Sequence, residues 1–179
     1  IPTVIFSQAL QKEESFKQDL MQRNGSENIH VLHEELSDVL IKHVTVKRNN
    51  RDLTKAIEAI KEIRERYQNI CLDDKGSCLN QTYVFANQFS YMLEIALVIT
   101  KGALLRDEFR GAHYKPECPH RDDKNWLKTT IAAYQNTEPE ISYKPVDLRY
   151  LKPIERDYSK AKKAIPEFEN VPTNIVLPL

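Results

Sequence analysis

Residues able to do chemistry gather between positions 106 and 127, where charged side chains, two of the five His and the single Trp lie close together. A plain connection between helices does not require this density of polar groups, so we expect any function of the chain to lie here. The candidate residues are Arg106, Glu108, Arg110, His113, Arg121, Asp122, Asp123 and Trp126.

Metal binding and thiol chemistry are the first activities to weigh. His113, Cys118 and His120 form an H-x4-C-x-H pattern with Asp122 and Asp123 beside it. Its spacing matches no common structural zinc site, and a polar turn explains the same residues. A thiol two residues from a His in a proline-rich loop has poor geometry for an activated pair. We therefore predict neither a metal site nor a thiol nucleophile.

Carboxylates supply the other familiar chemistry. Asp122, Asp123, Glu108 and Glu94 are available, but adjacent acids are much commoner as helix caps and surface charge than as catalysts. Nothing in the sequence sets two of their pKa values apart. With only four Gly, the chain also has no glycine-rich phosphate loop. We predict no catalytic, cofactor-binding or metal residue in this chain.

Arg106, Glu108 and Arg110 allow two interpretations. If they end a helix, Arg106 and Arg110 share one face, and Glu108 points away from them. The two Arg would then complement the negative end of the helix dipole. Alternatively, the cluster docks with His113 and Trp126 against another domain or chain, since Arg and Trp are favoured interface anchors. Residue types alone leave both open.

Hydrophobic spacing predicts the elements that must position these residues. Residues 1–10 are expected to be a linker of strand or irregular character, anchored by Val4, Ile5 and Phe6. Helices are predicted over residues 11–24, 26–47, 50–67 and 80–109, with Ser26 capping the second and Asn49 or Asn50 the third. The fourth is the longest, and its apolar surface is wide enough to be buried on more than one side.

Beyond the fourth helix the pattern changes. Gly111 is expected to end that helix, and repeated Pro residues then forbid another long one. Residues 122–134 are compatible with a short helix or a strand, and residues 141–143 and 146–148 with short extended pieces. The predicted fold is mainly α, a spectrin-repeat-like three-helix up-down-up bundle with a Pro-rich, largely extended tail. We assign a linker to residues 1–14, the bundle to 15–113 and the tail to 114–179.

Composition restricts the class of protein. The 179 residues carry 26 basic and 26 acidic side chains, so no overall field favours nucleic acid. The apolar runs are too short for direct membrane insertion. Three Cys, an odd number, suit a reducing cytosol better than a disulfide framework. Because the chain begins without Met, we expect it to be part of a longer polypeptide.

The stretch R-D-E-F-R-G-A-H at residues 106–113, followed by R-D-D-K-N-W-L-K at 121–128, resembles a motif near the end of succinate dehydrogenase and fumarate reductase flavoprotein subunits. Residues 60–66 and 141–146 are similar to further segments of that family, and Arg48 stands where the family has an Arg. The chain departs from the motif at Phe109, where Ser is commoner, and at Thr129, where the family has His.

The resemblance implies a C-terminal helical domain that packs against its own flavin-binding domain. The family's covalent FAD and its dicarboxylate-binding residues lie upstream and cannot be carried onto this sequence. The complete enzyme would oxidise succinate to fumarate and pass electrons to an iron–sulfur subunit and a cytochrome b membrane anchor. It would lie peripherally on the cytoplasmic face of the membrane. The eight candidate residues would then dock the two domains.

Three alternatives remain at the level of sequence. The chain could come from a fumarate reductase or from an L-aspartate oxidase, two related flavoenzymes. A free-standing helical interaction module is the third. An upstream G-x-G-x-x-G dinucleotide fingerprint would favour a flavoenzyme over the module.

Overall fold

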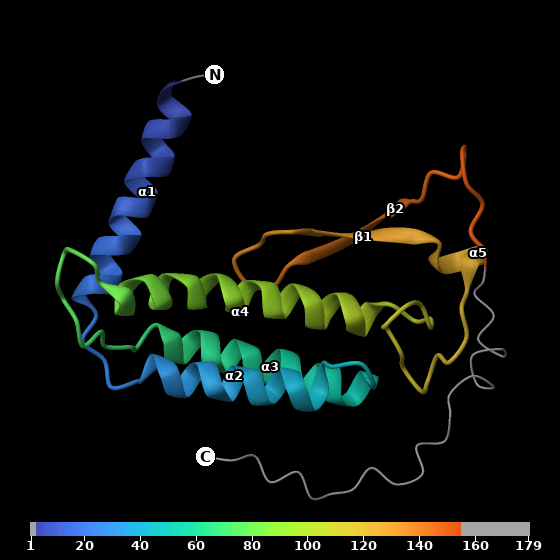
Figure 1. Cartoon of the computed structure of the whole chain (residues 1–179), viewed down its shortest axis with the longest axis horizontal. Coiled ribbons are helices and arrows are strands. Elements are labelled where there is room, and N and C mark those ends of the chain that lie inside the picture. Colours follow the sequence, from blue (N-terminus) through green and yellow to red (C-terminus); the bar gives the residue numbers. More distant parts are fainter. Residues whose placement is uncertain (1–2, 155–179) are drawn as a thin grey trace, which may run out of the picture. The chain divides into compact units, whose positions relative to one another are not determined.

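The computed structural model of the chain describes residues 3–154. Contacts divide the chain into two units, Ile1–Val146 and Asp147–Leu179, and each is described by itself. The helices and strands of the described residues lie in the first unit (Figure 1). They are α1 (Thr3–Gln22), α2 (Ile29–His43), α3 (Asn50–Tyr67), α4 (Gln81–Leu105), α5 (Asp123–Trp126), β1 (Lys128–Ala133) and β2 (Glu140–Pro145).

The three helices α2, α3 and α4 lie side by side and form the predicted mainly helical bundle (Figure 1). The stripe predicted for α3 is confirmed, because its apolar positions are buried against α2 and α4. Phe89, Leu93 and Leu97 supply the facing side of α4. The buried stripe of α3 consists of Leu53, Ala56, Ile57, Ile60, Ile63 and Tyr67.

Asparagine caps begin all three bundle helices. The side-chain oxygens of Asn28, Asn49 and Asn80 accept backbone N–H groups of the first turns of α2, α3 and α4. Asn49 was one of the two residues expected to cap α3. The cap predicted for α2 at Ser26 is wrong, because Asn28 accepts from the amide of His30 at 2.8 Å. That helix also ends at His43, four residues before the predicted end at Lys47.

The first ten residues are not the strand or irregular segment that the sequence suggested. From Thr3 to Gln22 no Gly or Pro interrupts the chain, and these residues form one helix. Val4, Ile5 and Phe6 are 57–62% exposed and therefore anchor nothing within the described residues. The assignment of residues 1–14 as a linker stays a prediction.

α4 ends at Leu105, earlier than the predicted end near Phe109. The reason is that residues far along the chain satisfy its last carbonyl groups. The Lys115 ammonium donates to the carbonyl of Leu104 at 2.9 Å, and the Tyr143 hydroxyl donates to that of Leu105 at 3.4 Å. Gly111 therefore does not end the helix. Gly111 instead lies in a turn beyond α4, where it adopts a φ of 60°.

After the turn, residues 122–134 adopt both of the predicted options, a short helix followed by a strand. α5 leads directly into β1, which pairs antiparallel with β2 from Lys128↔Pro145 to Ala133↔Glu140. The hairpin runs along α4 (Figure 1). The Thr130 methyl group of β1 lies close to Gly102 of α4. Two strands alone are marginally stable in water, so this hairpin depends on contacts with the bundle.

Ionic contacts hold the tip of the hairpin on the bundle. Glu138 pairs with Lys61 of α3, and with Lys101 of α4 at 2.9 Å. These hydrogen bonds lower the pKa of Glu138 to about 2. Arg64 also donates to the carbonyl of Thr137 at 2.6 Å.

The structure describes the predicted tail as far as residue 154. Residues 146–148, expected to be extended, form no strand. In the second unit, Arg149 pairs with Asp147 at 2.7 Å, and its guanidinium lies 5.5 Å from the centre of the Tyr150 ring. The predicted extended character of residues 155–179 lies outside the described residues.

α4 contacts both the other bundle helices and the hairpin, as its wide apolar surface predicted. Phe89 and Leu93 are fully buried, but Val84, Met92 and Ile99 are 38–49% exposed, so these three predicted positions are not fully covered. By length and composition alone α4 could cross a membrane. The core helix of a soluble protein passes the same test, and α4 packs against α3 as such a helix does.

Gly25 is the glycine whose replacement should cost the most stability. A Cβ at this position would lie 1.8 Å from the backbone oxygen of Asn69, so Gly25→Ala must push two backbone segments apart. We expect a loss of about 3 kcal/mol in the free energy of unfolding, measured by urea denaturation. Gly102→Ala is the matched control. Its Cβ meets only Thr130 at 3.9 Å, and helix propensity should stabilise it by about 0.5–1 kcal/mol. Equal losses would contradict the prediction.

Candidate functional site

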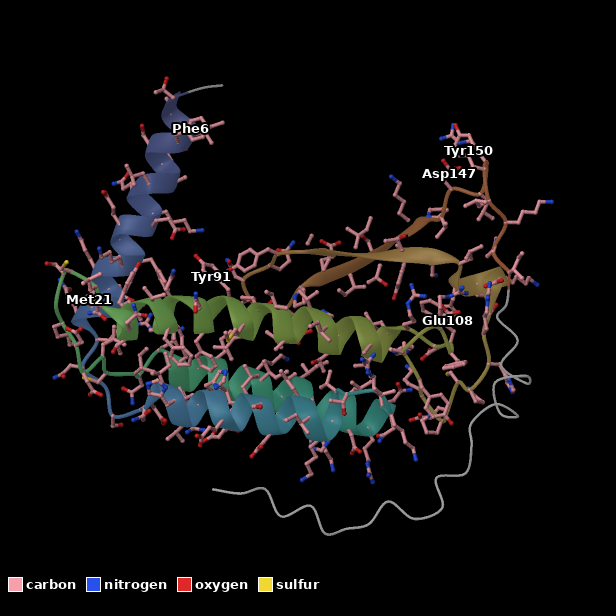
Figure 2. The ribbon with its side chains drawn as sticks, viewed as in Figure 1. Phe6, Met21, Tyr91, Glu108, Asp147 and Tyr150 are labelled. Carbon is pink, nitrogen blue, oxygen red and sulfur yellow. The ribbon has the colours of Figure 1, made fainter. Side chains whose placement is uncertain are left out.

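The polar segment predicted to carry function runs from the end of α4 to the start of β1. We call residues 106–127 the clamp segment, because its side chains connect the bundle to the hairpin. Figure 2 shows Glu108 just beyond α4 and close to α5. Several hydrogen bonds of the clamp segment join residues that are far apart along the sequence, such as those from Arg106 to Lys128 and from Lys115 to Asn50.

Glu108 is the centre of the clamp segment and is fully buried. Its carboxylate pairs with the guanidinium of Arg106, and with Arg110 through bonds of 2.8 and 2.9 Å. The backbone amide of Asp122 donates to the same carboxylate at 3.3 Å. Burial of a charge is tolerated only with such pairing. The expectation that Glu108 points away from both Arg side chains is therefore wrong, because the three residues leave the helix.

A more exposed layer of charge extends this cluster toward solvent. Arg110 reaches Asp123 at 2.6 Å, and Arg121 makes two bonds of 2.7 Å to the same carboxylate. The hydrogen bonds from Arg121 and Arg110 lower the pKa of Asp123 to about 2. The hydrogen bond to Glu108 in turn raises the pKa of Arg110. These groups thus stay charged across the physiological range of pH.

Arg106 fastens the base of the hairpin. Its guanidinium donates to the carbonyl of Lys128 at 2.6 Å, to that of Trp126 at 3.2 Å and to the Thr130 hydroxyl at 3.2 Å. It also lies 5.4 Å from the centre of the Trp126 ring. Trp126 meets Tyr143 of β2 edge to face at 5.5 Å. One arginine thus joins α5, β1 and the buried carboxylate, and β2 is reached through Trp126.

His113 connects the clamp segment to the α2–α3 connection, which lies at the same end of the bundle as the end of α4. Its Nδ1 lies 2.8 Å from a guanidinium nitrogen of Arg48, and its Nε2 lies 2.9 Å from the carbonyl oxygen of Arg106. Burial lowers the pKa of His113, and the charges of Arg48, Lys115 and Arg106 lower it further, against the opposing effect of the Arg106 carbonyl.

Lys115 is fully buried, which is rare for this residue type. Its ammonium donates to Asp107 at 2.6 Å, to the side chain of Asn50 at 2.8 Å and to the carbonyl of Leu104 at 2.9 Å. All three donor positions are thus used. The contact with Asn50 fixes the clamp segment to the start of α3.

The structure brings the predicted residues together, with different tasks. Arg106, Glu108 and His113 face inward, and Asp122 caps α5 by accepting the amide of Asn125 at 3.0 Å. Arg110, Arg121 and Asp123 form the outer layer, and Trp126 packs on the hairpin. Sequence reasoning missed four partners as site residues. They are Asn50, Asp107, Lys115 and Thr130.

The sequence around these four residues gives no indication that they belong to the site. Lys115 looks like a surface lysine, and only the position of Asn50 at a helix start links it to anything predicted. Arg48 was noticed through the family resemblance, because it follows α2, but its contact with His113 spans 65 residues. No sequence window contains both.

The geometry favours positioning over catalysis. Within residues 3–154, no His, Cys, Asp and Glu side chains group in a way that could hold a metal ion. Burial raises the pKa of Cys118, which makes its thiolate scarce. His113 has both ring nitrogens engaged, so it has none left for a substrate. The side chains of the clamp segment hold structure in place.

A groove of about 640 Å³ lies elsewhere in the first unit. Phe16 of α1, Arg64 of α3, Tyr91 of α4 and Tyr134 of the hairpin loop are among its lining residues. In Figure 2, Tyr91 lies near the loop that joins β1 to β2. Acidic and basic residues both line the groove, so it shows no preference for a charged ligand.

Comparison with known proteins matches the chain to one part of several larger subunits. The family described as "Fumarate reductase flavoprotein C-term" matches residues 33–158. The succinate dehydrogenase flavoprotein subunit of Bacillus subtilis (strain 168) is 44% identical over 162 residues, which cover 89% of this chain and 28% of that protein. The fumarate reductase flavoprotein subunit of Helicobacter pylori (strain J99) is 33% identical, with 88% and 23% covered. The chain thus spans about a quarter of the length of these relatives.

Solved structures show the same fold. A quinol–fumarate reductase with menaquinol molecules superposes with a TM-score of 0.78 at 26% identity, covering 86% of this chain and 27% of that one. A mutated E. coli quinol fumarate reductase superposes with a TM-score of 0.81 at 24% identity, with coverage of 87% and 27%.

Proposed function

Because this chain belongs to the C-terminal family of fumarate reductase flavoproteins, we propose that it is the scaffold of a flavoprotein subunit that oxidises succinate to fumarate. The observation that favours succinate oxidation over fumarate reduction is the 44% identity to a succinate dehydrogenase flavoprotein, against 33% to a fumarate reductase flavoprotein. Family membership also removes the free-standing helical module from the alternatives.

In this proposal, the covalent FAD and the dicarboxylate site belong to the part of the polypeptide that precedes this chain. A pyrophosphate cradle needs free backbone amides and space at a helix start, and the glycines that precede α2 and α4 do not supply them. Gly25 is closed by the backbone of Asn69, and the amide of Gly76 already donates to Asp74 at 2.7 Å. No step of the reaction is assigned to residues 3–154.

The partners follow from the same proposal. Electrons from succinate would pass from the flavin domain to an iron–sulfur subunit and then to quinone at a cytochrome b membrane anchor. The subunit would lie peripherally on the cytoplasmic face of the membrane, held there by the complex. Support comes from the quinol–fumarate reductases that share this fold.

The clamp segment would serve as the docking element for the flavin domain. Its inner residues are used within the chain, so their task is to hold the outer layer in place. The side chains of Arg110 and Asp123 remain 29% and 40% exposed, and Phe109 is 37% exposed beside them. Arg and aromatic side chains at a rigid surface are typical interface anchors.

Arg110→Ala in the complete flavoprotein, expressed with its partner subunits, tests this docking role. We expect assembly of the complex and succinate-dependent quinone reduction to fall about tenfold, as for loss of a moderate interface anchor. Arg51→Ala is the control, because its side chain is 78% exposed at the start of α3. Circular dichroism of the 179-residue chain with each change separates lost docking from lost folding. Normal assembly and turnover of Arg110→Ala would overturn the docking role.

Fumarate reduction is the second candidate, favoured by the family description and by the fumarate reductase relatives. The two directions are distinguished on the complete enzyme. Succinate oxidation with a quinone acceptor and fumarate reduction with a low-potential donor are measured side by side. Faster fumarate reduction would favour the second candidate.

A further inference from the structure

His113 holds a protonation state that its neighbours dictate. A guanidinium can only donate hydrogen bonds, so the Nδ1 that lies 2.8 Å from Arg48 must accept and carries no proton. A carbonyl oxygen can only accept, so Nε2, 2.9 Å from the oxygen of Arg106, must donate. His113 is therefore the neutral tautomer with its proton on Nε2.

Each of these two contacts leads to a different part of the fold. Arg48 also donates to the carbonyls of Val44 and Thr45 at the end of α2, at 2.7 and 3.0 Å. The backbone amide of Arg48 donates to the carbonyl of Tyr114 at 3.0 Å. Arg106 leads to Glu108 and to the base of the hairpin. The imidazole of His113 thus joins the α2–α3 connection to the clamp segment.

The charges around His113 oppose its protonation. Arg48 faces it from the α2–α3 connection, Arg106 from the end of α4 and Lys115 from the clamp segment itself. Lys115 is paired with Asp107, but the side chain of Arg48 donates within the described residues only to carbonyl oxygens and to His113. A proton on Nδ1 would set two donors against each other at hydrogen-bond distance.

We propose that His113 is a proton-sensitive joint, which at mildly acidic pH releases the clamp segment from the α2–α3 connection. Protonation of Nδ1 breaks the bond to Arg48 and forces the ring to move, while Arg48 keeps its bonds to the carbonyls of Val44 and Thr45. The Arg48–Tyr114 backbone contact is the next to separate. Release loosens Arg106, which fastens the hairpin. Any effect on the flavoprotein rests on the proposed function, but the joint itself is a property of this chain.

The pH window follows from the direction of the shift. Above the ordinary His pKa of about 6.5, the ring is neutral in both closed and open forms, and pH does not alter the joint. Below that value the open form takes up a proton and the closed form resists it, so the closed form loses stability as pH falls. The ratio of open to closed forms can rise at most about tenfold for each pH unit.

Nitrogen NMR of the imidazole rings in the 179-residue chain tests the proposal. We expect His113 to show the Nε2-protonated tautomer at pH 7.5 and to titrate below pH 6.5. Hydrogen exchange in residues 128–145, corrected for its intrinsic pH dependence, should show about three- to tenfold more opening at pH 5.5 than at pH 7.5. Titration of His113 at or above pH 6.5 would overturn the joint.

Two replacements and one control complete the test. His113→Asn keeps an acceptor for Arg48 without a proton to gain, so its hairpin exchange should lose the acid dependence. His113→Gln keeps a donor for Arg106 and should be loosened at every pH. His120→Asn changes an exposed His of the same segment and should behave as the unaltered chain. If His113→Asn retained the full acid dependence, another group would be responsible and the proposal would fail.

Discussion

Replacing Glu108 by Gln is expected to lower the free energy of unfolding by about 3–5 kcal/mol. The change keeps the shape of the side chain and removes its charge. Arg106 and Arg110 then lose the buried carboxylate with which both of them pair. Breaking a buried ion pair from one side costs more than the pair contributes, because the remaining charge stays desolvated.

Urea unfolding followed by circular dichroism measures this loss. Glu62→Gln on the exposed side of α3 is the control, and it should lie within about 0.5 kcal/mol of the unaltered chain. Hydrogen exchange should show that the loss is concentrated in the clamp segment and hairpin. A change of less than about 1 kcal/mol for Glu108→Gln would mean that water reaches the carboxylate and that the clamp is not closed.

A double-mutant cycle that combines Glu108→Gln with Arg110→Met measures the interaction energy between these two side chains. Arg110 also binds the exposed Asp123, whereas Arg106 also fastens the hairpin, so Arg110 is the partner that can be removed with fewer other losses. If Glu108 and Arg110 act together, the double change should cost less than the sum of the two single changes by about 1–3 kcal/mol.

The sequence predicted those parts of the fold that depend on neighbouring residues. The stripe of α3 repeats every three or four positions, and the Asn49 cap lies directly beside it, so local periodicity was sufficient. The start of α1 was missed because exposed apolar residues there look like a buried strand. Val4, Ile5 and Phe6 show that apolar type alone does not report burial.

The geometry of the clamp segment could not be predicted from the sequence, because it depends on contacts between residues far apart along the chain. The motif located the segment, because charge density along the chain is visible in sequence. The end of α4 was misplaced because Lys115 and Tyr143 satisfy its last carbonyls from outside the helix. With the helix shortened, Arg106, Glu108 and Arg110 are no longer related by helical spacing. Their pairing could not be deduced from positions two residues apart.

The bundle core should be as sensitive as the clamp, and Phe89→Ala is the strongest test of it. Phe89 is fully buried in α4 and packs edge to face against Tyr67 and His33, with both pairs of ring centres 5.9 Å apart. Because these three rings come from three different helices, the cavity left by Ala lies where α2, α3 and α4 meet. We expect a loss of about 3–5 kcal/mol.

Met92→Ala on the same helix is the matched control. Met92 is 38% exposed, so its truncation removes little buried surface and should cost less than about 1 kcal/mol. Phe89→Leu should lose less than Phe89→Ala, because it leaves a smaller cavity among the same neighbours. Urea midpoints at constant m-value give the three numbers. If Phe89→Ala and Met92→Ala cost the same, α4 would not be held by its Phe89 face, and the hairpin contacts of Lys101 and Gly102 would have to supply its docking.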